Sequence, residues 1–522
     1  VGTLTLSNAI AGTGELIKDN TVSVRLLGSN TMSGPVTINR GNLTIGSGGL
    51  GHVSTLTLNG VGGGDGTTLT LRDDAIVGAG VALSLTATDS NNRAGILNEA
   101  GTNIVDGAIT LNGAGPAIVR VIAGRLEING PISGPSFTDL ISFRGGGTNI
   151  IRSQFTIPSA GMQKDDAGVW ELNSANNSFA YLRIIAGTLK LLNDNALAPA
   201  GHVRTDGGVL DLDGHNQTVA GLMNSRATPV TTIANSSTTA DARLTVATSP
   251  TDAPWITGTI LADATTGGTR KVSLTLGGGG TVIFTNASTF SGDTLLNAGT
   301  LAFSGNGAFV NSSPINLAAG TTIDASGRND ATLTINASQV LKGNGAFNVL
   351  GNVVNNGTLE FKVSKAGATL SNDSLNGATA VTYGGTLRLV ISASPALATT
   401  EAFKLFSAGS YSGSFASIEP AVPAFGLAWD TSTLAADGTL RVKQGAVANP
   451  TNIAATVVSN GAVLQISWPA EHTGWTLQGQ TNGLDAGLSS NWGVVPGSPG
   501  TNQVWLPINK ANGTVFYRLI YP

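Results

Sequence analysis

The chain has 522 residues, with 71 Gly, no Cys, 11 % charged residues and a formal net charge of −4 at pH 7. Typical soluble domains carry about 25 % charged residues, so Thr, Ser, Asn and Gly must form most of this surface. The small net charge argues against nucleic acid as a partner, the lack of Cys excludes disulfides and thiolate metal sites, and no run approaches the ~20 apolar residues of a membrane span.

One short phrase, Gly-Thr-Leu-x-Leu, recurs with variation along the chain. Its apolar residues alternate with small polar ones, the period-2 pattern of a half-buried strand. Self-similarity at a short, regular interval predicts a solenoid. In chain order the copies begin at Gly2, Gly41, Ser54, Thr67, Gly124, Gly187, Gly208, Gly299, Ala331, Gly357, Gly385 and Gly438.

Three longer segments align with one another: Ser23 to Ile45, Val169 to Leu191 and Thr281 to Phe303. Each contains three strand-like pieces separated by Asn, Ser or Gly corners, which predicts one turn of a three-sided coil of ~20–25 residues. The apolar spacing of helices is nearly absent. We therefore expect an all-β fold, with a right-handed parallel β-helix (β-solenoid) over residues 1–445.

Stacked coils place equivalent side chains above one another, because neighbouring strands lie ~4.8 Å apart. Leu189 and Leu301 are predicted to be buried rungs of such ladders, and Thr300 to face outward. Asn residues at the corners are expected to stack as amide ladders. The first ten residues already carry the strand phrase, with Leu4 and Leu6 at ladder positions, and no polar capping unit is expected before them; the alternative is a lost upstream segment or a folded-back loop.

The composition changes near Val447. Strand-like pieces rich in large aromatic residues follow, separated by Gly, Pro and Asn turns, and they predict a small C-terminal β-sandwich over residues 446–522. Its Trp residues are interpreted as core, with a carbohydrate-stacking face as the alternative. They are Trp468, Trp475, Trp492 and Trp505.

Several segments resemble the passenger-associated transport repeats, also called autotransporter-associated β-strand repeats, of secreted Gram-negative bacterial proteins. "TFSGDTLLNAGTLAF" from Thr289 and "TMSGPVTINRGNLTI" from Thr31 are similar to the main family phrase. "IAGTGELIKDN" from Ile10 resembles a second phrase, and "GVLDLDGHNQTVAGL" from Gly208 the coil that follows. The resemblance implies a β-helical stalk that is secreted or displayed at the cell surface. Val1 is not an initiator Met, so the chain is either processed or a fragment, and a removed export signal is the favoured explanation.

The nearest candidates for catalytic carboxylates are two adjacent acidic pairs, Asp73 with Asp74 and Asp165 with Asp166. Glycoside hydrolysis needs two carboxylates that face each other across a groove. Neighbours along a strand point to opposite faces, so neither pair forms a ready dyad. Both pairs are interpreted as turn or solvated-surface residues.

Metal and phosphate sites have weak support in the sequence. "DLDGHN" (Asp211 to Asn216) has a faint likeness to a calcium loop but lacks the full pattern, so a coil corner is expected. "GGGG" (Gly277 to Gly280) leads into the strand at Val282 and is interpreted as a corner rather than a phosphate loop. The histidines lack metal-ligand spacing, although His215 lies near two Asp residues; they are His52, His202, His215 and His472.

These patterns favour a non-enzymatic extracellular structural protein, a rod-like β-solenoid that assembles head-to-tail into surface fibres or matrix. The expected partner is a second copy of the chain, whose C-terminal region would receive the first coil, Val1 to Ile10. The alternative is an adhesin or glycan-binding surface stalk, and the second alternative is a polysaccharide-active β-helix enzyme. No catalytic, cofactor-binding or metal-binding residue is assigned, and no cofactor is implied.

Overall fold

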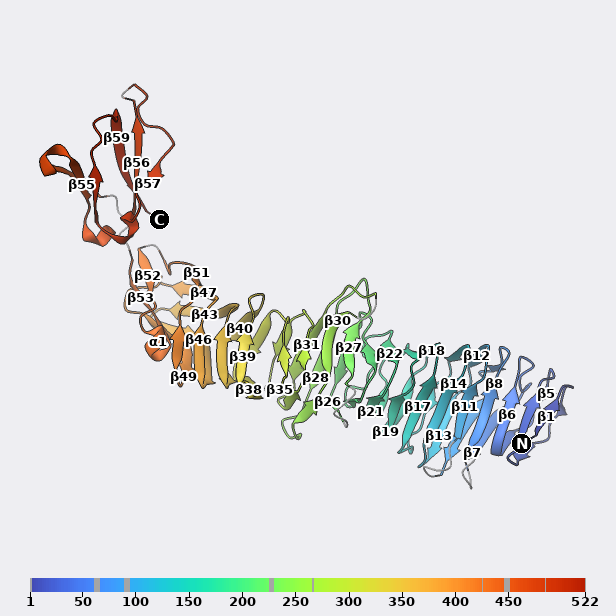
Figure 1. Cartoon of the computed structure of the whole chain (residues 1–522). Coiled ribbons are helices and arrows are strands. Elements are labelled where there is room, and N and C mark those ends of the chain that lie inside the picture. Colours follow the sequence, from blue (N-terminus) through green and yellow to red (C-terminus); the bar gives the residue numbers. More distant parts are fainter. Residues whose placement is uncertain are drawn as a thin grey trace. The chain divides into compact units, whose positions relative to one another are not determined.

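The computed structural model describes residues 2–60, 66–88, 94–224, 230–264, 267–424, 426–445, 451–483 and 485–521. The chain forms two compact units, Val1–Leu359 with Asn376–Thr382, and Glu360–Leu375 with Tyr383–Pro522. Strands account for 55 % of the structure and helices for 2 %, and parallel coils stack into a β-solenoid of about 15 turns (Figure 1). The predicted solenoid is therefore confirmed. Val1 and residue 446, where the C-terminal module is predicted to begin, lie outside the described residues.

The early coils contribute strands to two sheets. The strands of the larger sheet are β1 (Thr3–Leu6), β3 (Leu16–Asp19), β4 (Ser23–Leu26), β6 (Val36–Ile45), β7 (Thr55–Gly60), β8 (Thr67–Leu71), β10 (Ala82–Ala87), β11 (Ala94–Asn98), β13 (Ile109–Gly113), β14 (Ala117–Val121), β16 (Ile132–Ser133), β17 (Leu140–Gly145), β19 (Phe155–Lys164), β21 (Ser178–Ile184), β23 (His202–Thr205) and β26 (Gly221–Met223). Those of the other are β9 (Ile76–Val77), β12 (Thr102–Val105), β15 (Arg125–Ile128), β18 (Thr148–Ile151), β20 (Val169–Leu172), β22 (Thr188–Leu191), β24 (Val209–Asp211), β27 (Thr232–Asn235) and β30 (Ile260–Ala264).

These coils have three sides. β10, β11 and β12 follow one another around one turn, and β13, β14 and β15 lie on the next turn in parallel register with them. The ten-residue strand β6 pairs with both β7 and β8, so two sides of its coil are one continuous strand. The three strand-like pieces predicted for each coil are thus present.

Later coils of the first unit use new strand columns. One column is β25 (Gln217–Val219), β28 (Ala242–Ala247), β31 (Val272–Gly277), β34 (Thr294–Leu296), β37 (Ile315–Ala318) and β40 (Val340–Asn344); another is β29 (Trp255–Thr257), β32 (Thr281–Phe284), β35 (Thr300–Gly305), β38 (Thr322–Arg328) and β41 (Ala346–Leu350). Shorter groups are β33 (Ala287–Ser288) with β36 (Ala308–Phe309), β39 (Thr332–Ile335) with β42 (Asn352–Asn355) and β46 (Ala380–Tyr383), and β2 (Ala11–Gly12) with β5 (Thr31–Met32).

The interior is a set of side-chain ladders. Trp170, Leu189 and Leu210 are in register on three successive coils, and each has an exposed fraction of 0 %. Leu301 is 1 % exposed and pairs with Val282 and Ile323, while its neighbour Thr300 is only partly buried. The predicted alternation is confirmed, and each rung contributes roughly 1.5–3 kcal/mol of hydrophobic stabilisation.

Amide side chains also stack between coils. Asn59 Nδ2 donates to Asn39 Oδ1 at 3.0 Å, Asn193 to Asn173 at 2.6 Å, and Asn329 to Asn306 at 2.9 Å. The sequence separations are 20, 20 and 23 residues, so each bond joins neighbouring coils. These pairs confirm the predicted amide stacking at corners.

Coil length varies more than the alignments predicted. The bond from Asn177 to Ala196 joins adjacent coils over 19 residues, and the bond from Lys271 to Asp241 does so over 30. The expected interval of ~20–25 residues is therefore too narrow. The strands still pair across the longer interval, since Ala242 to Ala247 of β28 face Val272 to Gly277 of β31.

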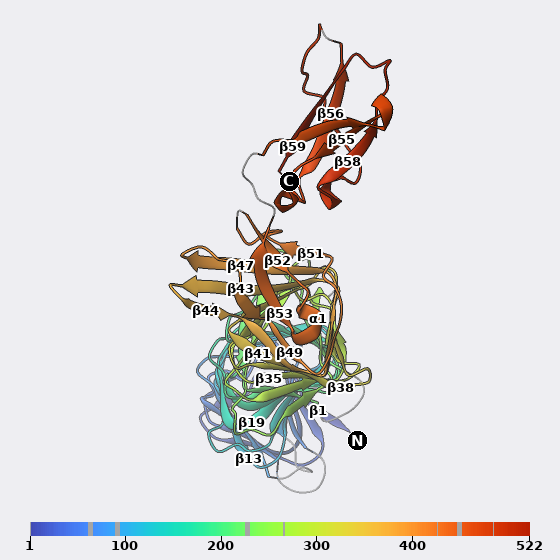
Figure 2. The same cartoon turned by 90° about the vertical axis from the view of Figure 1, so that its left-hand side faces the viewer.

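The second unit contains further coils and an antiparallel sheet. Its strands are β43 (Thr358–Ala366), β44 (Thr369–Asn372), β45 (Ser374–Ala378), β47 (Thr386–Ser394), β48 (Ala402–Lys404), β49 (Phe406–Ala408), β50 (Tyr411–Gly413), β51 (Ser417–Glu419), β52 (Leu427–Asp430) and β53 (Thr439–Gln444). β43, β44 and β47 lie side by side in Figure 2, where β44 folds back antiparallel to β43. Arg388 on β47 reaches Glu360 on one side and Glu419 on the other.

Sheet β48–β53–β52 and the short helix α1 (Leu434–Asp437) close the coils of this unit. Phe406 packs against Phe361 and Tyr383 of the coils at ring distances of 5.4 and 5.1 Å. The Tyr383 hydroxyl donates to the carbonyl oxygen of Leu434 at 2.9 Å. An antiparallel sheet in this place covers strand edges that would otherwise stay open.

The C-terminal segment forms two antiparallel sheets. One contains β54 (Ala454–Val458), β55 (Val463–Ser467) and β58 (Gln503–Pro507), and the other β57 (Gly493–Val494), β56 (Thr476–Asn482) and β59 (Thr514–Ile520). Three short 3-10 turns connect them: η1 (Ser459–Gly461), η2 (Ala470–His472) and η3 (Ser498–Gly500). Ile466, Trp468 and Leu477 form one buried cluster with residues of both sheets, as in a small sandwich.

Candidate functional site

The first acidic pair forms a turn. Asp73 and Asp74 lie between β8 and β9 with φ values of 55° and 62°, in the left-handed region. Asp73 pairs with Arg72 at 2.7 Å, and Asp74 Oδ1 accepts the backbone N–H of Thr102 at 2.8 Å. Both carboxylates are occupied by structural bonds, so the turn interpretation is confirmed.

The second acidic pair separates into two roles. The Asp165 side chain accepts hydrogen bonds from Ser142 at 2.6 Å, Gln163 at 2.8 Å and Arg144 at 3.1 Å. Asp166, with φ 59°, accepts the backbone N–H of Gly145 at 3.0 Å. The two side chains hold different neighbours and do not face each other. The surface interpretation is wrong for Asp165, which is buried, because the network across β17 and β19 takes it out of solvent.

The segment Asp211 to Asn216 forms a corner after β24, as predicted. Asp211 Oδ1 accepts the backbone N–H groups of Asp213 at 3.1 Å and Ser236 at 2.9 Å. Lys190 lies 3.1 Å from Asp213. The Asp211 carboxylate therefore accepts backbone hydrogen bonds, and the Asp213 carboxylate is paired with Lys190. Among residues that the structure describes, no group of three or more His, Asp and Glu side chains is placed to hold a metal ion.

The four histidines lie in four different environments. His52 is exposed, and His215 Nδ1 lies 3.3 Å from Asp194. His472 is 5 % exposed, with its ring 5.4 Å from that of Trp475. His202 stacks between two other aromatic rings, described below. His215 is close to Asp211 and Asp213 in sequence, but its hydrogen-bond partner is Asp194, so the three residues do not form a shared site.

The glycine run after β31 is a corner. Gly278 and Gly279 have φ values of 81° and 93°, which side chains with a Cβ rarely adopt. Gly280 N donates to the carbonyl oxygen of Thr248 on the preceding coil at 3.1 Å. The turn feeds β32 at Thr281, as the sequence predicted.

The C-terminal Trp residues are not all core. Trp468 and Trp475 are 4 % and 7 % exposed, so the core interpretation holds for them. Trp492 lies under the guanidinium of Arg518 at 4.2 Å. Trp505 is 56 % exposed, and the core interpretation is wrong for it. A two-sheet module of this size buries only one face of each sheet, and Trp505 on β58 lies on the other face.

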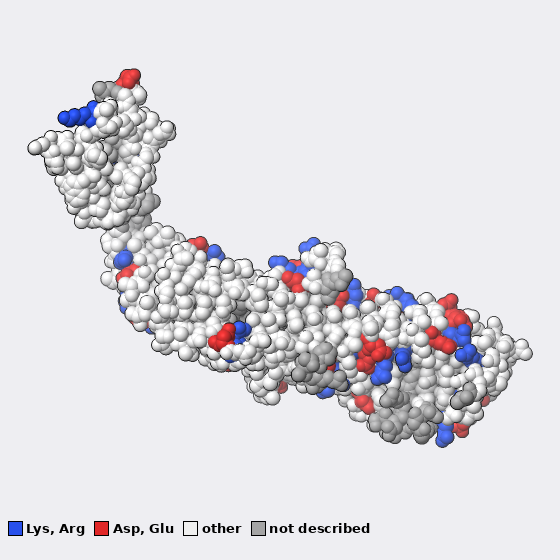
Figure 3. All heavy atoms as spheres, in the orientation of Figure 1, with Lys and Arg blue, Asp and Glu red and all other residues white. Residues whose placement is uncertain are grey.

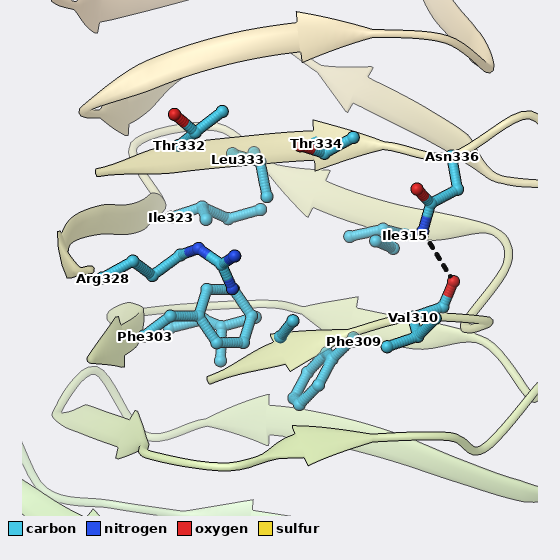
Figure 4. Close-up of a pocket in the computed structure, with 12 residues that line it drawn as sticks. Phe303, Phe309, Val310, Ile315, Ile323, Arg328, Thr332, Leu333, Thr334 and Asn336 are labelled. Carbon is cyan, nitrogen blue, oxygen red and sulfur yellow. Dashed lines mark hydrogen bonds between the residues drawn. The ribbon is translucent and has the colours of Figure 1, made fainter. Parts of the chain in front are cut away.

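An apolar cavity of about 220 Å³ opens in the solenoid wall between β36 and β39 (Figure 4). These two strands belong to different sheets, so the wall is interrupted here. Asn336 Nδ2 bridges the gap at one end by donating to Val310 O at 2.9 Å, and Arg328 bridges it elsewhere through Gly307 O. Phe303 and Phe309 lie in its floor. Arg328 is also paired with Asp330 at 3.0 Å, so its charge is already matched.

A second candidate site is a row of rings on the outer face of β21, β23 and β29. His202 lies between Tyr181, at 5.8 Å and 26° between ring planes, and Trp255, at 5.2 Å and 40°. Arg204 is 4.2 Å above the Tyr181 ring, and its Nε donates to His202 Nε2 at 3.2 Å. Burial, together with the nearby Arg204 charge, lowers the pKa of His202, which keeps that nitrogen an acceptor.

Two glycines make room for these rings. A Cβ on Gly161 would fall 2.2 Å from Tyr181 Cζ, and a Cβ on Gly221 would fall 2.4 Å from the Trp255 indole. Tyr181 pairs with Gly161 on one side and His202 on the other, and His202 pairs in turn with Gly221. The rings therefore lie in the places that side chains of these glycines would take.

The sequence did not predict this ring row. Tyr181 and Trp255 are far apart in the chain, and their coils have unequal lengths, so no fixed spacing links them. The one sequence feature that could have indicated it is Tyr181 opposite Gly161 on the preceding coil. That pairing can be recognised only when the strand register is known.

On the face shown in Figure 3, charges of both signs are interspersed. Figure 3 shows Lys and Arg beside Asp and Glu over a largely uncharged face. Arg125 and Arg152 both pair with Glu127, for example. In the part of the chain that the structure describes, no helix has the length and apolar character needed to cross a membrane. Comparison with protein-family models, curated proteins and solved structures gives no match.

Proposed function

We propose that this chain is a non-enzymatic structural protein of the cell exterior, secreted or displayed at the surface, in which a β-solenoid associates head-to-tail into fibres or matrix. The supporting observation is the first strand. β1 pairs with β4 on one side, and Leu4 on β1 is 53 % exposed although it is in register with the ladder through Val24. Among the described residues β4 is the only strand that pairs with β1, and a strand edge that carries an exposed ladder residue is a template for pairing with another chain.

The two surfaces proposed to meet are unlike, which favours a heterologous contact. The second unit contains the antiparallel sheet β48–β53–β52, whereas β1 pairs in parallel with β4. Unlike surfaces that join head-to-tail give open filaments when the rotation between copies does not close a ring. The resemblance to autotransporter-associated repeats supports an extracellular location for such a filament.

The test is the association state of the chain comprising residues 1–522, followed by light scattering and electron microscopy over a range of concentrations. Leu4→Lys places a charge on the open edge and should abolish filaments without changing the melting temperature, because Leu4 is already exposed. Ile122→Lys is the matched control, since Ile122 is an apolar residue 59 % exposed on a middle coil. It should leave filaments intact. A monodisperse monomer at high concentration contradicts the proposal, as does equal loss of filaments in both variants.

An adhesin or glycan-binding stalk is the second candidate. The ring row Tyr181–His202–Trp255 favours it, because partly exposed aromatic rings in line are suited to stacking against sugars. The two functions are compatible, since the ring row lies on a side of the solenoid and β1 at its edge.

A further inference from the structure

We propose that the ring row on β21, β23 and β29 is a binding site for an acidic polysaccharide, with Trp255 stacking on a sugar ring and Arg204, which lies over the Tyr181 ring, pairing with a uronic-acid carboxylate. This site is additional to the proposed structural role and does not depend on self-association. Three features carry it: the spacing of the rings, their support by glycines, and the state of the Arg204 guanidinium.

The rings are spaced along the direction in which the coils stack. Their centroids are 5.8 and 5.2 Å apart, which follows the ~4.8 Å separation of neighbouring strands. That interval is close to the length of one pyranose unit in an extended polysaccharide. An extended peptide advances ~3.3 Å per residue and would not keep step with the rings.

The glycines fix the rings against the sheet. Because Gly161 and Gly221 have no Cβ, the Tyr181 ring and the Trp255 indole occupy that space, and both side chains keep part of their surface exposed. Rings held in this way lose little conformational freedom on binding, which favours affinity. The apolar face of a sugar then covers apolar ring surface without loss of its hydroxyl hydrogen bonds to water.

Arg204 supplies the charge preference. Its neighbour Arg183, in register on β21, is paired with Asp206 at 2.7 Å. Arg204 has instead a ring below it and a donor bond to His202, and it pairs with no carboxylate of the described residues. The terminal guanidinium nitrogens can therefore take a carboxylate in a bidentate bond.

A nucleic-acid strand fits this surface less well. It carries one phosphate per nucleotide and needs a continuous basic groove, whereas the chain has a net charge of −4 and Arg183 is already neutralised by Asp206. An acidic polysaccharide, which can offer a single carboxylate to the single unpaired guanidinium of Arg204, fits this surface better than a nucleic-acid strand does.

The test is a titration of the intact chain with a short oligogalacturonate, followed by isothermal calorimetry. Binding is expected, and neutral oligomers of galactose or xylose of equal length should bind about tenfold more weakly or not at all. Trp255→Ala and Arg204→Gln should each weaken oligogalacturonate binding about tenfold. Trp505→Ala is the matched control, because Trp505 is an exposed Trp on the C-terminal module, and its affinity should equal that of the parent chain.

Circular dichroism and melting curves of each variant establish that the fold is retained. If Trp255→Ala is unstable, Trp255→Leu keeps apolar bulk at the same position while removing the ring, and it should lose affinity in the same way. The proposal is overturned if the parent chain does not bind oligogalacturonate, if neutral oligomers bind equally well, or if Arg204→Gln leaves the affinity unchanged. Stronger binding of a single-stranded RNA of similar charge, with the same dependence on Trp255 and Arg204, also overturns it.

Discussion

Lys18 and Lys164 occupy equivalent corners of two distant coils and make the same pair of bonds. Lys164 Nζ donates to the carbonyl oxygen of Asp166, two residues on, at 2.7 Å, and to that of Ala186, 22 residues on, at 3.0 Å. Lys18 Nζ donates to the carbonyl oxygen of Asn20 and, 22 residues on, to that of Arg40 at 2.8 Å. Each lysine therefore ties its own corner to the corner of the next coil.

The glycine after each distant acceptor completes the corner. Gly41 and Gly187 have φ values of 70° and 69° and begin two copies of the repeated phrase. The third aligned segment lacks the lysine: Leu276 stands in its place, and the glycine run that follows makes the turn without it. This corner is thus formed by glycines in left-handed conformations, without a lysine ammonium.

Removal of one lysine should test this account. Lys164 has an exposed fraction of 0 % and also donates to the carbonyl oxygen of Asp165 at 2.6 Å. Lys164→Met keeps most of the bulk but leaves these carbonyls without donors, so we expect a loss of roughly 2 kcal/mol of unfolding free energy. Urea denaturation measures it. Lys190→Met, at a partly exposed strand position, is the control and should cost less than ~1 kcal/mol; equal losses contradict the account.

The same lysine should make stability depend on alkaline pH. Burial lowers the pKa of Lys164 from 10.5 to about 8, against the opposite effect of Asp166 and Asp165. Between about pH 8 and pH 10.5 the unfolded chain binds the proton that the folded chain has released, so stability rises with pH through this window. Chemical denaturation of the parent chain and Lys164→Met at several pH values should show this rise in the parent relative to the variant. Parallel curves would rule it out.

Ladder positions should be far more sensitive than outward positions one residue away. Leu189 is 0 % exposed between Trp170 and Leu210, and Leu189→Ala should cost roughly 2–5 kcal/mol because a cavity is left. Thr188→Ser, on the outer face, should cost under ~0.5 kcal/mol. Melting curves of the two variants measure the contrast, and similar shifts would refute the assignment of faces. Leu301 already lines the wall cavity, so the added cavity would be harder to interpret there, and Leu189 is the cleaner position.

Chelation should leave the corner at Asp211 to Asn216 intact. Its carboxylates accept backbone N–H groups of Asp213 and Ser236, and Lys190 compensates part of the charge. The melting temperature with EDTA should equal that without it. A marked drop that Ca²⁺ reverses would show a calcium-stabilised coil instead.

The elements best predicted from sequence are those that depend on local alternation. Leu189 and Leu301 are buried where the period-2 pattern places them, because neighbouring side chains of a strand point to opposite faces whatever lies above or below. The positions of the corners were predicted equally well. Asp74 and Gly278 have left-handed backbone conformations, and Asn, Asp and Gly tolerate that region better than other residues do.

The interpretation of the C-terminal aromatics was less successful. Aromatic content indicated a small sandwich and therefore a core, which Trp468 joins and Trp505 does not. Trp468 directly follows β55 and Trp505 lies on β58, and the two have similar neighbours in sequence. Which face of a two-sheet module is covered depends on the pairing of β55 with β58 and on the position of the other sheet, and neither is a local property.

By itself, then, the sequence determined the repeat, the parallel strands, the inward ladder residues and the glycine corners, since all of these follow from the alternation and turn preferences of neighbouring residues. Only the tertiary structure decided which residues of different coils touch. Tyr181 lies in the place left by Gly161, Trp255 lies in that left by Gly221, and Lys18 and Lys164 bond to the next corner. The physical reason is that contacts between coils depend on strand register, and register is set by the length of each corner, which varies from coil to coil.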